Sequence, residues 1–160
     1  MKRSQHLLAV AGLALAVWAM SYGFYYAVWI EHQTLDHIGG SLAGAFQQAA
    51  LRETAASHAS LDDYARAKYV YTREVDAHSH WIGLAMILMV LAALWDRLSF
   101  GEGVRGMLAL VLIAGAYGFP LGVLIQNYVG SGVGQGIAVA ASGLMIVAFG
   151  LVAVGFARER

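Results

Sequence analysis

Four long apolar stretches separated by polar segments divide the chain. The first covers residues 7–30 and contains no charged side chain, and the others cover 78–95, 106–125 and 135–157. About 20 apolar residues in a helix cross the roughly 30 Å hydrocarbon core of a bilayer. The pattern therefore predicts an all-α integral membrane protein, in which residues 1–160 form a single membrane domain built as a four-helix transmembrane bundle.

The first apolar stretch predicts a retained membrane helix rather than a cleaved signal peptide. It is longer than a signal-peptide core, and no small-residue cleavage site follows it. Its far end is crowded with aromatic residues, as in the aromatic belt at a membrane–water interface. These residues are Tyr22, Tyr25, Tyr26 and Trp29.

A polar insert, residues 31–77, lies between the first two apolar stretches. Gly39-Gly40 predicts an early break and a point where the chain can reverse, because glycine adopts backbone angles that other residues avoid. Apolar residues at helical spacing predict a short helix within 41–58. Ser60 precedes two acidic residues and predicts the start of a second helix that runs into the second span. We therefore expect a helical hairpin between spans 1 and 2.

The last two spans carry helix-modifying residues. Pro120, the only proline, predicts a kink or an early end in the third span. Gly136, Gly143 and Gly150 recur every seven residues in the fourth. A stripe of small residues lets another helix approach closely in lipid. This face predicts packing within the chain, self-association, or association with other membrane-protein subunits.

Charge indicates how the spans are oriented. Only 12% of residues are charged and 59% are hydrophobic, whereas soluble domains are about 25% charged. The basic residues outside the insert all fall on one side of the predicted membrane, and the insert itself carries seven acidic and four basic residues. By the positive-inside rule both termini are cytoplasmic and the insert is extracytoplasmic, which predicts a multi-pass protein of a bacterial-type inner membrane. The outer basic residues are Lys2, Arg3, Arg97, Arg105, Arg158 and Arg160.

Three features of the sequence exclude or disfavour several functions. The chain has no cysteine, which excludes disulfides, thiolate ligands, iron–sulfur clusters and covalent c-type haem attachment. The net charge is zero, so no basic field indicates nucleic acid. No ionisable residue lies deep in a span, which argues against a pump or a secondary transporter.

Histidines and carboxylates gather at the two ends of the insert. If the first two spans pack antiparallel, both groups lie at the same depth and could form one site. Mixed imidazole and carboxylate ligands suit zinc, copper or iron, and two histidines in a bundle could instead bind a b-type haem. The first group is Glu31, His32, Asp36 and His37, and the second is Glu74, Asp76, His78 and His80.

His78 and His80 are the strongest ligand candidates. Two residues along a helix correspond to about 200°, so the two side chains point in nearly opposite directions and do not share one metal ion. Glu74 and Asp76 each lie four residues before one histidine, on the same helical face. The alternative is that these polar residues lie at a span end because water is there. His58 and His6 are not predicted as ligands.

The segment Ala77–Met86 resembles a motif of the haem–copper oxidase catalytic subunit. In that family a His-x-His pair at the extracytoplasmic start of a helix sends its two histidines to two haems. The segment also resembles small four-helix membrane proteins with His-x-His at the start of the second span. The resemblance covers ten residues and implies haem or metal ligation by His78 and His80. The oxidases' copper-site histidines and crosslinked His–Tyr pair have no counterpart here, so it does not imply oxygen reduction.

These observations predict a membrane metalloprotein that binds b-type haem or a copper- or zinc-type ion near the extracytoplasmic surface. Electron transfer within a larger membrane complex is the expected use. Two alternatives stay open, namely a non-catalytic accessory subunit and an envelope metal-handling protein.

Overall fold

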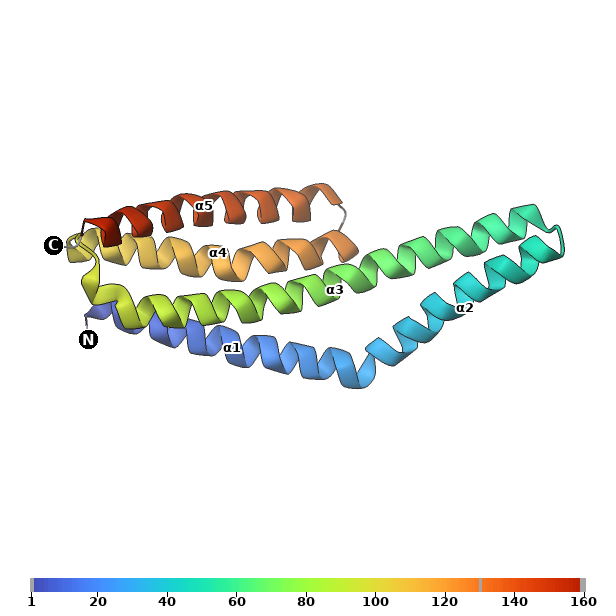
Figure 1. The fold of residues 1–160 in the computed structure, drawn as a ribbon, viewed down its shortest axis with the longest axis horizontal. Helices are drawn as coiled ribbons and strands as arrows, with labels where there is room; N and C mark the ends of the chain where they lie inside the picture. The colour runs from blue at the N-terminus through green and yellow to red at the C-terminus, as the bar shows by residue number, and fades with distance from the viewer. Residues whose placement is uncertain (1, 130, 159–160) are drawn as a thin grey trace. The chain divides into compact units, whose positions relative to one another are not determined.

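The computed structural model describes residues 2–129 and 131–158. It is 93% helical, and the described residues form five α-helices and no strand (Figure 1). A short 3₁₀ turn, Trp95–Arg97, follows the third helix. The helices are α1 (Arg3–Trp29), α2 (Glu31–Ala50), α3 (Thr54–Leu94), α4 (Glu102–Tyr128) and α5 (Ser131–Ala157).

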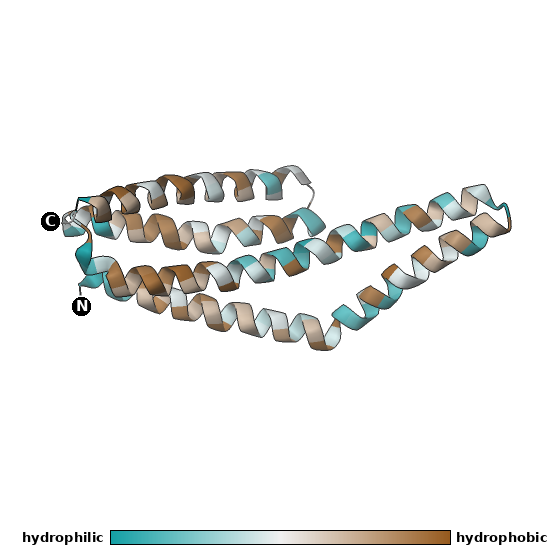
Figure 2. Cartoon of the chain, in the orientation of Figure 1, coloured by the Kyte–Doolittle hydropathy of each residue, from teal (hydrophilic) through white to brown (hydrophobic). Residues whose placement is uncertain are grey.

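Four of these helices are long and apolar enough to cross a membrane, namely α1, α3, α4 and α5. The prediction of an all-helical chain is confirmed, and each predicted span falls within one of these helices or extends only a few residues past its end. Figure 2 shows that α5 and most of α4 are hydrophobic, whereas α2 and the first half of α3 carry many hydrophilic residues. Each helix extends beyond the predicted apolar stretch at one or both ends, because flanking polar residues continue the same backbone hydrogen bonding.

The chain divides into two compact units. One comprises Met1–Met20 and Asp76–Arg160 and is called the bundle unit here. The other, Ser21–Val75, is called the paired-helix unit. The helices α1 and α3 each contribute residues to both units.

Within the bundle unit, α1 packs on α3 through small residues. The buried positions of α1 recur at helical spacing, at Leu8, Gly12, Leu15 and Ala19. A Cβ added to Gly12 would lie only 3.2 Å from the carbonyl oxygen of Ala85, so the two backbones approach closely here. In lipid such close approach is a main source of helix association.

The helices α4 and α5 pack in the same way along an antiparallel pair. A Cβ added to Gly122 would lie 2.6 Å from the backbone nitrogen of Ala138. Near the connection, a Cβ added to Gly134 would lie 2.6 Å from the backbone nitrogen of Gln126. Further along, Gly115 makes room for the Met145 side chain. The two helices therefore touch backbone to backbone along one line of glycines and small residues.

Polar contacts join the helices at the end of the bundle unit where α1 begins and α5 ends (Figure 1). The indole nitrogen of the fully buried Trp95 donates to Ser4 Oγ at 3.1 Å, and the Ser4 backbone N–H donates to Glu102 Oε1 at 2.9 Å. Arg105 is buried, and its Nε donates to the Phe100 carbonyl at 2.7 Å. Lys2 lies 3.7 Å from Asp96. The described basic residues outside the insert gather at this end, as the charge pattern predicts, while Arg160 lies outside the described residues.

In the paired-helix unit, α2 runs antiparallel to the first half of α3. The chain reverses at residues 51–53, where Arg52 adopts a left-handed φ of 59°. The prediction of a break at Gly39-Gly40 is wrong, because α2 continues through both residues. Glycine inside a helix costs only about 1 kcal/mol relative to alanine, and hydrogen bonds on both sides of the pair are enough to offset this.

Two other local predictions are corrected. Ser60 is not an N-cap, because α3 already begins at Thr54, and its Oγ instead donates to Gln48 Oε1 of α2 at 2.8 Å. Pro120 does not end its helix, since α4 runs to Tyr128 with the proline buried inside it. A proline removes a single backbone hydrogen bond, and packing against α5 holds the helix on both sides of it.

Candidate functional site

The helical turn that carries His78 and His80 is fixed by its buried neighbours. Ala77 is fully buried and Trp81 is 2% exposed, and both lie on the face of α3 that packs into the bundle unit. The Trp81 ring meets Trp18 of α1 edge to face, with centroids 5.9 Å apart. The orientation of α3 about its axis is therefore set, and the two histidines lie beside this buried face.

His78 is half-buried against α1. Its Nδ1 lies 3.0 Å from the backbone carbonyl oxygen of Ala19. A carbonyl only accepts hydrogen bonds, so the ring carries its proton on Nδ1 when it is neutral, and Nε2 keeps a free lone pair. Metal-binding histidines are typically held in this way, with the second ring nitrogen donating to a backbone carbonyl or a carboxylate.

His80 is exposed and lies against α4 rather than α1. Its Nδ1 lies 2.6 Å from the backbone carbonyl oxygen of Asp76, one turn earlier in α3. The imidazole also meets the Phe119 ring of α4 edge to face, with centroids 4.9 Å apart. The carbonyl again places the proton on Nδ1 and the lone pair on Nε2. The two imidazoles thus contact different helices, as their spacing of two residues predicts.

A shallow groove of about 260 Å³ runs beside His80. Its lining residues all belong to α3, so it has a single wall. A Cβ added to Gly83 would meet nothing within 4 Å, which leaves the surface next to His80 open. The other lining residues are Ser79, Leu84 and Ile87.

The predicted carboxylate ligands are placed differently from one another. Glu74 is buried and accepts a hydrogen bond from the Tyr22 hydroxyl, and Glu31 accepts one from Tyr71 at 3.2 Å. Asp76 and Asp36 are exposed. Two of the four carboxylates are therefore engaged by tyrosines in the paired-helix unit.

These tyrosines form a cluster that the sequence analysis missed. Tyr22 and Tyr26 stack with centroids 6.4 Å apart, and Tyr26 also lies 6.4 Å from Tyr71. The sequence pattern predicts an interfacial belt that includes Tyr22 and Tyr26, but Tyr26 is 7% exposed while Tyr25 and Trp29 are exposed. Tyr22 and Tyr26 are four residues apart, which places both on one helical face. This spacing could have predicted the tyrosine cluster.

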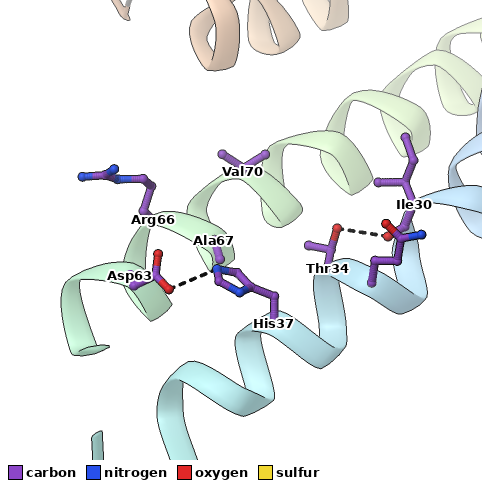
Figure 3. A pocket seen from close by; sticks show the side chains of 8 residues that line it. Ile30, Thr34, His37, Asp63, Arg66, Ala67 and Val70 are labelled. Atoms are coloured by element: carbon purple, nitrogen blue, oxygen red, sulfur yellow. Dashed lines mark hydrogen bonds and ion pairs between the residues drawn. The ribbon is translucent and has the colours of Figure 1, made fainter. Parts of the chain in front are cut away.

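The histidines of α2 lie in the paired-helix unit. His32 is exposed, and His37 Nε2 lies 3.1 Å from the Asp63 carboxylate of α3 (Figure 3). Ser41 Oγ donates to the same carboxylate at 3.1 Å. Both partners of the His37–Asp63 pair are about half exposed. The pair lines an open groove of about 370 Å³, together with Arg66, Val70 and neighbouring residues. Asp63 was not among the predicted site residues, because nothing in the sequence indicates which α3 residue faces His37.

Within residues 2–129 and 131–158, no group of three or more histidine or carboxylate side chains is arranged to hold a metal ion. Ligand roles for His78, His80, His32, His37 and the four carboxylates remain predictions. Comparison of the chain with protein-family models, with curated proteins and with solved structures finds no match.

Proposed function

We propose that the protein is a multi-pass membrane component that binds b-type haem through the Nε2 atoms of His78 and His80 and transfers electrons within a larger complex. The observation that carries this proposal is the environment of the two rings. Both Nδ1 atoms face backbone carbonyl oxygens, at 3.0 Å and 2.6 Å, so both Nε2 atoms keep a lone pair. An imidazole in this state is ready to act as an axial ligand.

The geometry favours haem over a bare metal ion. A zinc or copper ion takes three or four ligands from side chains that lie close together. Haem iron receives four nitrogens from the porphyrin and needs only one or two imidazoles. His78 and His80 contact different helices and point in nearly opposite directions, so each would hold a haem of its own rather than share one ion. Bound haem would supply reversible one-electron chemistry.

The groove beside His80 favours a site completed by another subunit. It has a single wall, formed by α3, and Gly83 leaves that wall flat. A porphyrin bound there would still expose one face until a second protein surface covered it. This supports the second part of the proposal, that the chain works within a larger membrane complex.

A second candidate function is that of an accessory subunit without a cofactor. It rests on the outer face of α5, where Cβ atoms added to Gly136, Gly143 and Gly150 would each meet nothing within 4 Å. The internal packing uses Gly134 and Gly155 instead. A smooth outer strip of this kind suits close approach by a helix of another subunit.

For both proposed functions, the orientation of the chain in the membrane follows from its charge distribution. We place both termini in the cytoplasm and the insert, residues 31–77, on the extracytoplasmic side of a bacterial-type inner membrane. The support is the basic group at the end of the bundle unit that carries the chain ends, which includes Lys2, Arg3 and Arg158.

The absorption spectrum of protein purified in mild detergent tests the haem proposal. We expect a Soret band, and we expect His80→Ala to reduce its intensity per protein while His58→Ala, an exposed histidine of the paired-helix unit, leaves it unchanged. His78→Ala also removes the hydrogen bond to Ala19, so thermal stability is measured beside the spectrum. A protein without a Soret band that holds stoichiometric copper or zinc by elemental analysis overturns haem in favour of a metal ion. Absence of both overturns cofactor binding and leaves the accessory role.

A further inference from the structure

A groove of about 600 Å³ lies between the first turns of α1 and α4, within the bundle unit. It is larger than the grooves that contain His80 and His37, and its volume falls within the range of roughly 300–1,000 Å³ that is usual for small-molecule sites. Both helices begin at the same end of the unit, so they run in the same direction along the groove (Figure 1). No residue of the proposed haem site lines it.

The inner part of the groove is apolar and is hollowed by two glycines of α4. Gly103 and Gly106 lie three residues apart on one face of the helix, and a Cβ added to either would meet nothing within 4 Å. Leu110 continues this face one turn further into the span, and Leu7 lines the groove from α1. These two leucines are 59% and 39% exposed, so the apolar part of the groove is uncovered.

The mouth of the groove is basic. Arg3 and His6 line it from α1, on one helical face, and both side chains are exposed. Among the described residues neither of them is paired with a carboxylate. By contrast, Lys2 and Arg105 lie 3.7 Å and 3.8 Å from Asp96. Arg3 and His6 therefore offer hydrogen-bond donors that no described acidic side chain uses.

One acidic side chain, Glu102, also lines the groove. Its Oε1 accepts the backbone N–H of Ser4 at 2.9 Å, so the carboxylate connects the starts of the two helices. The first turn of α4 has no side-chain cap, and its N–H groups, which lack partners within the helix, add partial positive charge at this end. The described charged residues at this end are five basic and two acidic, so the field at the mouth favours an anion.

The length of the groove suits a ligand with two different ends. From Glu102 to Leu110 the chain takes eight helical steps, which cover about 12 Å. The headgroup layer on each side of a bilayer is only about 6 Å thick, since the whole bilayer exceeds its hydrocarbon core by roughly twice that distance. With the helix starts at headgroup depth, the leucines at the inner end lie among acyl chains. The groove therefore fits an anionic head joined to an apolar tail.

We propose that the groove between α1 and α4 binds one anionic phospholipid. The phosphate accepts hydrogen bonds from Arg3 and His6, and an acyl chain lies along Gly106 and Leu110. Basic pockets between membrane helices on the cytoplasmic side are typical sites for anionic headgroups. A zwitterionic lipid would instead bring an ammonium group that Arg3 repels. The site rests on the membrane insertion and orientation in the proposed function, and it does not require haem.

Native mass spectrometry of the full chain in mild detergent counts the bound lipid. With phosphatidylglycerol and phosphatidylcholine of the same acyl chains at equal concentration, we expect a preference of about tenfold for phosphatidylglycerol. Arg3→Ala is expected to lower its affinity about fivefold, which is the contribution of one basic side chain at an anionic surface. Added salt should weaken binding as well. Arg97→Ala, an exposed basic residue at the same end but outside the groove, is the control and should leave the affinity unchanged.

Two further variants change the groove in opposite directions. Glu102→Gln keeps an acceptor for the Ser4 N–H but removes the negative charge, so it is expected to raise the affinity for phosphatidylglycerol about fivefold. Gly106→Leu fills the apolar part and is expected to lower the affinity about tenfold, as if roughly two methylene groups of the lipid lost their contact. Val104→Phe adds bulk on another exposed face of α4 and is the control. Helical circular dichroism checks that each variant is folded.

Several outcomes overturn the proposal. Equal retention of phosphatidylcholine indicates a groove that accepts any acyl chain, and equally strong competition by inorganic phosphate indicates a site for the free ion. A loss in Arg97→Ala as large as that in Arg3→Ala indicates attraction by the whole basic end. Unchanged affinity in all groove variants places the lipid elsewhere. A chain recovered in the membrane fraction without bound phosphatidylglycerol overturns this site alone, whereas a chain absent from that fraction overturns the proposed function too.

Discussion

Two antiparallel helix pairs in this chain are held together by different chemistry. The pair α4–α5 is joined by backbone-to-backbone contact at glycines. The pair formed by α2 and the first half of α3 is joined by serine, glutamine and histidine hydrogen bonds around a single buried alanine. Both arrangements place helices close together, but they suit different solvents.

The difference follows from what each solvent offers an apolar side chain. In lipid, large apolar residues gain nothing by moving from acyl chains to a protein interface, so small residues that permit close contact decide the packing. In water, large apolar residues gain by burial and should be inside. The α4–α5 pair obeys the lipid rule. The α2–α3 pair does not follow the expectation for water, since Leu35 and Phe46 remain exposed.

The largest effect on the free energy of unfolding is expected from a side chain added at the glycine contact of α4 and α5. Gly122→Leu places atoms where a Cβ alone is 2.6 Å from the Ala138 backbone nitrogen. Because neither backbone can move without separating the helices, we expect a loss of about 3 kcal/mol or more in the free energy of unfolding, at or above the upper end of ordinary overpacking. Thermal unfolding in detergent measures it. A stable Gly122→Leu protein would contradict the close contact.

A smaller effect is expected in the α2–α3 pair. Ser57→Ala removes the hydrogen bond to the Ala45 carbonyl, and one such bond contributes about 1 kcal/mol. Faster hydrogen exchange at α2 amides, with α4 amides unchanged, would be the measured result. Exchange that accelerates equally in both helices would show that the two pairs unfold as one, and would weaken the comparison.

A still smaller effect on the free energy of unfolding is expected from the exposed His37–Asp63 pair, which lines the groove in Figure 3. Asp63→Asn removes the ionic partner of His37, and both side chains are about half exposed. Exposed ion pairs contribute about 0.5 kcal/mol, and salt screens them. The change in unfolding free energy should therefore be small at low salt and vanish at high salt. A loss above about 2 kcal/mol would show that Asp63 has a role beyond this pair.

The smallest effect on folding is expected at the outer glycines of α5. Gly143→Leu adds a side chain into open space, so thermal stability should be unchanged, in contrast with Gly122→Leu. If the strip contacts another subunit, the assembly should become smaller in mild detergent while the monomer stays folded. Unchanged assembly together with unchanged stability would remove the strip as support for the accessory role.

The sequence alone determined the all-helical architecture, the four apolar helices and the gathering of basic residues at one end of the bundle unit. These features follow from composition and local periodicity, which act residue by residue. The opposite directions of His78 and His80 were also predictable, since a step of two residues along a helix fixes the angle between them.

Tertiary structure decided which of several available faces of each helix is used. Gly39-Gly40 has the composition of a turn, yet neighbouring hydrogen bonds carry α2 through it and the chain reverses at Arg52. The α5 sequence offers two sets of glycines, and the one at Gly134 and Gly155 packs inside. The partners of His37 and Glu74 come from residues 26 and 52 positions away, respectively. These features depend on contacts between distant segments of the chain. A local sequence pattern therefore cannot predict them.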